Sequence, residues 1–271
     1  MYSLLPRASL IIFTIIFGVQ VLNGSNGTSL LPTMAITVSV QEENNKSFEI
    51  THGVASGDIT NDSAVVWSRS NREAQMHVGY DISSNFSQPN SLNSTSLANQ
   101  TTDYTAHAML EGLKPDTVYY YRVWFSTPDP YQDNSNSSFP SDSLAGTFRT
   151  APDPSAPITK PISFILAADL GGQKHCRQAS TGGYFIFKNM KELSPDFFIA
   201  NGDMIYAADK CPIEGPSDNW KNIAGNFSGI ADPDINCTNT EQVRDTYLKH
   251  WQYNRADPKL SSKRFDVLSM E

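Results

Sequence analysis

The chain has 271 residues and a formal net charge of −8, with 20 Lys and Arg against 28 Asp and Glu. This acidic balance argues against nucleic-acid binding, because that function needs a basic face. The three cysteines allow one disulfide and one free thiol in an oxidising compartment. We expect Cys211 to pair with Cys237, because both flank one polar segment, which leaves Cys176 to line a nearby site.

Residues 1–24 have the pattern of a secretory signal. Arg7 precedes an apolar run over residues 8–22 that is too short for a comfortable membrane span. The cleavage site is poorly marked, so an uncleaved N-terminal anchor is the alternative and would be the chain's only membrane contact. In both cases the protein is expected to be secreted or extracellular. Asn-x-Ser/Thr sequons are dense, as in exported glycoproteins, but the cell type decides their use. Residues 25–47 are polar and predict a linker.

Residues 48–150 contain short runs typical of β-strands, separated by turn residues. A Leu-x-Pro-x-Thr-x-Tyr corner ends at Tyr119, and the aromatic residues that follow alternate as a sandwich core requires. We expect an antiparallel β-sandwich, followed by a Pro-rich linker at residues 151–160. The Asn/Ser/Thr-rich residues 84–102 predict a long surface loop. The expected strands are residues 48–58, 63–70, 74–83, 104–110, 118–125 and 144–150.

A βαβ pattern begins after residue 161. Apolar residues 162–168 predict a strand buried on both faces, and residues 196–200 predict a second strand. Between them Phe187 and Met190 lie on an apolar helical face, and Thr181 or Ser180 is available to cap its start.

Residues 207–238 predict a long irregular segment. A second helix is expected to begin with Asn239 as its cap. Its apolar face is expected to contain Val243, Tyr247, Leu248 and Trp251. His250 lies beside that face, and a structural role is expected for it. His52 is also a lone histidine, for which a structural role, a ligand role or an interdomain contact remains open.

Asp169 and Asp203 follow the two strands of the βαβ pattern. Such crossovers are right-handed and return the second strand parallel to the first, so both aspartates should face one crevice. Either aspartate alone could simply hold a turn. Two carboxylates that converge in a buried crevice repel each other unless a cation lies between them. The pair therefore predicts a metal site.

The motifs Asp169-Leu170-Gly171 and Gly202-Asp203-Met204-Ile205-Tyr206 resemble the DxG and GDxxY blocks of calcineurin-like metallophosphoesterases of the purple acid phosphatase kind. Residues 182–203 also resemble the alkaline phosphatase D family. The resemblance implies that Asp169 binds one metal, that Asp203 bridges two and that Tyr206 binds the first through its phenolate. The implied cofactor is a binuclear centre of iron and a second divalent ion (Zn, Mn, Fe or Ca).

The resemblance also covers residues 48–150, whose opening HGVASGD is similar to the domain attached to phosphatases of both families. The implied fold is a fibronectin type III-like β-sandwich followed, over residues 161–271, by the first part of a layered α/β (αββα-type) metallophosphoesterase domain. The implied activity is hydrolysis of a phosphomonoester or phosphodiester by a metal-bound hydroxide.

In the resembled families the remaining ligands lie in later GNHD- or DDHE-like, VxxH and GHxH blocks, which this sequence lacks. No catalytic residue is identifiable in this chain. We therefore expect a fragment that binds metal weakly and is inactive alone; completion by a second polypeptide is the alternative. The alternative function is a non-catalytic surface or secreted binding module built on the β-sandwich.

Overall fold

The computed structural model describes residues 47–87, 90–128, 142–260 and 267–269. The expected signal or anchor (1–24) and the linker up to residue 46 lie outside these residues. None of the helices in the described part combines the length and the apolar run that a bilayer crossing needs.

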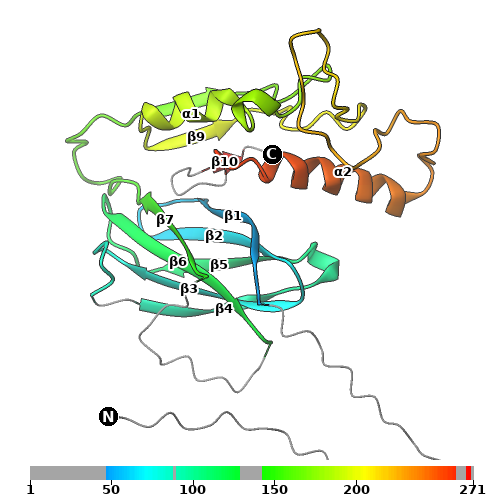
Figure 1. Ribbon diagram of the computed structural model, residues 1–271. Helices are drawn as coiled ribbons and strands as arrows, with labels where there is room; N and C mark the ends of the chain where they lie inside the picture. Colours follow the sequence, from blue (N-terminus) through cyan, green and yellow to red (C-terminus); the bar gives the residue numbers. More distant parts are fainter. Residues whose placement is uncertain (1–46, 88–89, 129–141, 261–266, 270–271) are drawn as a thin grey trace, which may run out of the picture. The chain divides into compact units, whose positions relative to one another are not determined.

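Seven antiparallel strands between residues 50 and 149, here called the β module, form two sheets (Figure 1). The first sheet has the order β1-β2-β5 and the second the order β4-β3-β6-β7. Both sheets contribute to a single buried cluster, with Val66 and Leu110 from the first and Val123 and Phe148 from the second. The strands are β1 (Ile50–Gly57), β2 (Ser63–Ser70), β3 (Ala74–Asp81), β4 (Asn90–Ala98), β5 (Thr105–Glu111), β6 (Val118–Ser126) and β7 (Leu144–Arg149).

Strand β6 shows the alternation that its aromatic sequence predicts. Tyr119 and Tyr121 are buried in the shared cluster, whereas Tyr120 and Trp124 lie half-buried on the other face. The hydroxyl of Tyr119 accepts a hydrogen bond from the backbone N–H of Lys114 at 2.8 Å, which closes the corner before the strand.

The prediction of a long loop over residues 84–102 is wrong for residues 90–98. Residues 90–98 form β4, which pairs antiparallel with β3 in a register that includes Ala74↔Ala98 and Gly79↔Ser91. Because β4 is an edge strand, the backbone hydrogen bonds to one neighbour suffice, and a polar composition does not prevent pairing.

The second part of the chain, residues 161–269, is here called the α/β region. It contains parallel strands β8 (Phe164–Ala167), β9 (Phe197–Ala200) and β10 (Val267–Ser269) in the order β10-β9-β8. Helix α1 (Phe185–Glu192) connects β8 with β9 and lies against β9 (Figure 1). Its Phe187 and Met190 share a buried cluster with Phe198 of β9. The predicted βαβ unit is confirmed, but its cap is not. The N-cap is Tyr184 and makes no side-chain capping bond, because a 3-10 turn over Ala179–Thr181 precedes it.

Strand β8 is not buried on both faces as its apolar sequence predicts. Ile165 and Ala167 pack against the cluster that contains α1. Phe164 and Leu166 point to the opposite face and are 56% and 55% exposed. A strand alternates its side chains between two faces, and α1 covers only one of them.

Helix α2 (Thr240–Arg255) begins where the sequence predicts, with the Asn239 side chain accepting from the N–H groups of Glu241 and Gln242. The predicted apolar face is wrong. The buried residues of α2 are polar, namely Thr246, His250 and Asn254, whereas Tyr247 and Trp251 are 45% and 44% exposed. The reason is that α2 packs against irregular segments of the α/β region, whose backbone carbonyl groups require hydrogen-bond donors.

His52 lies where β1 meets α2, and its backbone carbonyl accepts from the Arg255 guanidinium at 3.3 Å. Burial, followed by the nearby charges of Arg69 and Arg255, lowers the pKa of the His52 ring to about 4. The backbone carbonyl of His52 thus contacts α2, and the role of its side chain stays a prediction.

The lowered pKa of His52 predicts a loss of stability in acid. The folded state disfavours protonation of this ring, so its contribution is full above the unfolded-state pKa of about 6.5 and is lost as pH falls toward 4. After a discount for solvent screening, the loss is on the order of 1–2 kcal/mol. Urea denaturation at about pH 7 and about pH 5 should show a larger difference for the wild type than for His52→Gln. Equal differences would contradict this prediction.

Candidate metal site

Asp169 and Asp203 lie in two loops that leave the same end of the parallel sheet. Ala167 of β8 is paired with Ala200 of β9, so the chain after each strand emerges beside the other. The backbone N–H of Leu170 donates to the carbonyl of Asp203 at 2.8 Å and joins the two loops directly. Both aspartates have positive φ values, +61° and +50°, a conformation that Asp adopts more readily than most residues.

Tyr206 brings the two carboxylates together. Its hydroxyl donates to Asp169 Oδ1 at 2.5 Å and lies 3.2 Å from Asp203 Oδ2. The structure therefore places all three predicted ligands in one cluster. The predicted buried crevice is wrong, because both aspartates are exposed at the open end of the sheet.

The electrostatics of this cluster keep the phenol protonated. The hydrogen bond to Asp169, followed by desolvation and by the charges of Asp169 and Asp203, raises the pKa of Tyr206. The phenolic proton thus lies between two negative groups and reduces their repulsion. A cation at the same place would do so more strongly and would release that proton.

The donor set fits a hard metal ion, since it consists of two carboxylates and one phenol, all oxygen donors. In the part of the chain that the structure describes, no cluster of three or more His, Cys, Asp or Glu side chains is placed to hold a metal. The tyrosine is therefore needed to complete even a three-donor set.

The close packing of the Asp169 loop explains why glycine occupies positions 171 and 172. A Cβ at Gly171, whose φ is +80°, would lie 2.5 Å from the Tyr184 hydroxyl. A Cβ at Gly172 would lie 3.0 Å from the ring of Tyr206. The Asp169 loop can approach both tyrosines only because these side chains are absent.

Asn254 of α2 is a supporting residue that sequence reasoning missed. Its Nδ2 donates to the backbone carbonyl of Met204 at 2.8 Å, and its Oδ1 accepts from the Tyr184 hydroxyl at 2.8 Å. One amide therefore holds the Asp203 loop and the tyrosine beneath the Asp169 loop. The sequence signal was indirect, since Tyr184 lies in the GGYF segment that resembles the phosphatase family.

His250, also on the buried face of α2, has the structural role expected. Its two ring nitrogens contact the backbone carbonyls of Thr246 and Asp209 at 2.8 and 2.9 Å.

The predicted disulfide between Cys211 and Cys237 is wrong. Cys211 pairs with Cys176, with a Cα–Cα distance of 5.8 Å, whereas Cys237 is an exposed free thiol. The segments after Asp169 and after Tyr206 fold against each other around Asn222. Its side chain accepts from the Cys176 N–H and donates to the carbonyl of Pro212. Nearness in sequence did not predict this packing.

Comparisons with known proteins relate the chain to phosphatases. Residues 35–152 match the PhoD-like phosphatase N-terminal domain. Alkaline phosphatase D of Bacillus subtilis (strain 168) is 28% identical over 194 residues, which are 66% of this chain and 30% of that protein. The chain therefore spans less than a third of the length of this curated relative.

Among solved structures, one shares the fold of this chain. A structure of PhoD has a TM-score of 0.59 at 22% identity and covers 84% of this chain and 39% of its own. A purple acid phosphatase, PPD1 from yellow lupin (Lupinus luteus) seeds, has a weaker likeness, with a TM-score of 0.44 at 12% identity over 80% of this chain and 34% of its own. The predicted resemblance is confirmed: residues 35–152 match a PhoD-like N-terminal domain, and the chain is similar in sequence to an alkaline phosphatase D.

Proposed function

We propose that this homologue of alkaline phosphatase D is part of a secreted, metal-dependent phosphoesterase. The observation that carries the proposal is the meeting of Asp169, Asp203 and Tyr206 at the end of two parallel strands. The substrate class, phosphomonoesters or phosphodiesters, follows from the phosphatase relatives.

In the proposed site Asp169, Asp203 and Tyr206 would hold the metal centre, with Asp203 shared between its two cations and the Tyr206 phenolate as a ligand of the first. When bound, iron and a divalent partner supply Lewis acidity that stabilises the charge developing on the phosphoryl oxygens. The chain's own groups orient those cations and balance their charge. The exposed position of both carboxylates leaves the outer side of the cluster open for a phosphoester.

We further propose that residues 48–150 form a fibronectin type III-like β-sandwich and that residues 161–271 belong to the phosphoesterase domain. Two sheets with one shared core support the first assignment, and the parallel βαβ unit supports the second. The proposal of export rests on the signal-like residues 1–24 and on the Cys176–Cys211 disulfide, since such bonds persist mainly in oxidising compartments.

The metal assignment is tested by titrating the purified chain with Mn²⁺ and Fe³⁺. Three oxygen donors on one side of an exposed site should bind weakly, with a dissociation constant on the order of 10⁻⁴ M or weaker. Asp203→Ala should reduce that affinity at least about tenfold without loss of fold, because Asp203 is exposed. Asp218→Ala, which removes an exposed carboxylate elsewhere in the α/β region, should change nothing. Equal binding by wild type and Asp203→Ala would overturn the assignment.

Catalysis is tested separately with p-nitrophenyl phosphate. Two carboxylates and one phenol would be too few ligands to hold two cations firmly, so the purified chain should show negligible hydrolysis. Robust hydrolysis that is lost in Asp203→Ala would overturn the proposed inactivity and would strengthen the site assignment.

A further inference from the structure

Helix α2 presents polar residues on two opposite faces. At about 100° per residue, Arg244, Gln252 and Arg255 lie on one face, and Thr246, His250 and Asn254 lie on the opposite one. The first face contacts the β module, and the second contacts the loops of the candidate metal site. A single rigid element therefore lies between the two parts of the chain.

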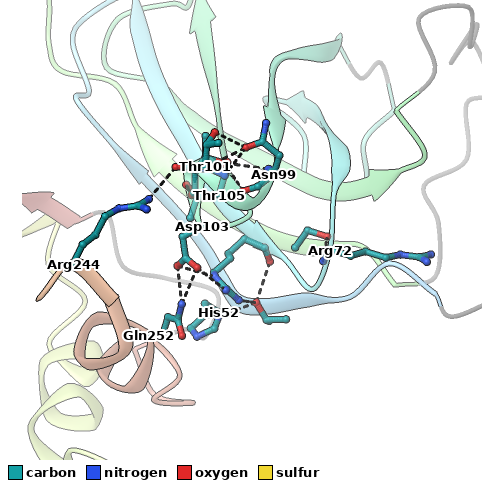
Figure 2. Close-up of polar contacts among 12 residues, drawn as sticks. His52, Arg72, Asn99, Thr101, Asp103, Thr105, Arg244 and Gln252 are labelled. Carbon is teal, nitrogen blue, oxygen red and sulfur yellow. Dashed lines mark hydrogen bonds and ion pairs between the residues drawn. The ribbon is translucent and has the colours of Figure 1, made fainter. Parts of the chain in front are cut away.

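The central contact with the β module is the carboxylate of Asp103. Gln252 Nε2 donates to both of its oxygens at 2.8 Å, and Arg69 of β2 donates to the same oxygens at 2.9 and 3.2 Å (Figure 2). Only 18% of the Asp103 side chain is exposed, so these charge-assisted bonds are partly shielded from water. We call the pair Asp103–Gln252 the clasp.

Asp103 is held rigidly on its own side. It follows a 3-10 turn, Gln100–Thr102, whose capping residue Asn99 accepts from the N–H groups of Thr101 and Thr102. The carbonyl of Thr101 in turn accepts from Arg244 of α2 at 3.0 Å (Figure 2). The Thr101 carbonyl and the Asp103 carboxylate are therefore two fixed acceptors for the donors of α2.

A further contact is made at the C-terminal end of α2. The guanidinium of Arg255 donates to the His52 carbonyl and lies 4.8 Å from the ring centroid of Trp67. A pocket of about 440 Å³ lies at this interface and is lined by Asp103, Gln252 and Arg255 together with Val65, Leu248 and Trp251, among others. Close apolar packing therefore does not fill this part of the interface, where polar contacts join α2 to the β module.

On the opposite face of α2, Asn254 contacts the loops of the candidate metal site and lies only two positions after Gln252 of the clasp. Asn254 binds the carbonyl of Met204, next to Asp203, and the hydroxyl of Tyr184 beneath Gly171. A shift or rotation of α2 would move this amide and loosen both loops.

We propose that the clasp makes the β module a positioning element for the metal site. By this route, Asp103 and Gln252 hold α2, α2 holds Asn254, and Asn254 holds the loops that present Asp169 and Asp203. Neither clasp residue touches metal or substrate. The inference rests on the proposed function only in assigning metal binding to the loops. The contacts from the clasp through α2 to the loops need no cation.

Native-state hydrogen exchange of the Leu170 amide tests the connection in the full chain without added metal. That amide is protected by the bond between the two site loops. Gln252→Ala should speed its exchange about tenfold, which corresponds to about 1.4 kcal/mol. Lys249→Ala is the matched control, since Lys249 lies on the same helix and pairs with Asp245 at the surface, and it should leave the rate unchanged. An unchanged Leu170 rate in Gln252→Ala, with faster exchange confined to α2, would overturn the inference.

A double-mutant cycle separates coupling from general weakening. If the clasp acts through Asn254, Gln252→Ala should add little to the Leu170 exchange rate once Asn254→Ala is present. If the two substitutions act independently, their effects on the rate will multiply, and that result would overturn the proposed connection through Asn254.

Mn²⁺ titration then separates the positioning role of the clasp from the proposed metal-binding function. Gln252→Ala should weaken Mn²⁺ binding about tenfold at an unchanged urea midpoint. If neither the wild type nor any variant binds Mn²⁺ but hydrogen exchange shows the expected coupling, the positioning role of the clasp is supported and the metal-binding function is contradicted. If the wild type binds Mn²⁺ and Gln252→Ala binds it equally, the positioning role fails.

Discussion

An alanine at Gly183 is expected to unfold the α/β region. Gly183 has a φ of +147°, and a Cβ there would overlap Oδ2 of Asp257 and lie 2.7 Å from its Cγ. Asp257 cannot move aside, because its carboxylate is fully buried and accepts from the backbone N–H groups of Tyr184 and Lys259. Displacing it would disturb a buried charge and break its bonds to a buried and a half-buried backbone N–H, so we expect a loss of more than about 3 kcal/mol.

The neighbouring residue provides a matched control. Gly182 also has a positive φ, +67°, but a Cβ there would meet no atom within 4 Å. Gly182→Ala should therefore cost only the backbone penalty of about 1–2 kcal/mol. Urea denaturation followed by tryptophan fluorescence measures both variants, because Trp220 and Trp251 lie in this region. Equal losses for the two variants would contradict the role assigned to Asp257.

Removing the Cys176–Cys211 disulfide is the second change with a large expected effect. The bond closes a loop with a sequence separation of 35 residues, and the chain-entropy relation gives a stabilisation of about 4 kcal/mol for a loop of this size. The double variant Cys176→Ser, Cys211→Ser should lose stability of that order in urea denaturation. Both cysteines are buried beside the site loops, so cation binding should weaken as well.

Cys237→Ser serves as the control for the disulfide. Cys237 is exposed and free, so its replacement should change stability by less than about 0.5 kcal/mol. Thiol labelling of the unfolded, unreduced chain should modify Cys237 alone. Labelling of Cys176 instead would restore the pairing of Cys211 with Cys237 that sequence proximity suggests.

The sequence by itself determined the βαβ unit and the position of the candidate metal site at the ends of its strands. Two apolar runs, the spacing of Phe187 and Met190, and the handedness of parallel crossovers require that Asp169 and Asp203 end on one edge of a sheet. These are local patterns joined by one strong topological rule. The Tyr119 corner and the Asn239 cap belong to the same class, because each depends on residues only a few positions apart.

The tertiary structure alone decided which distant groups support that site. Strand β4 pairs although its sequence is typical of a loop, and α2 buries the polar residues His250 and Asn254 in place of its apolar side chains. The disulfide partner of Cys211 and the acceptor of Gln252 were equally unreadable from the sequence. The physical reason is shared: each contact satisfies a backbone carbonyl, a buried charge or a thiol whose partner lies tens of residues away, and no local period encodes such a partner.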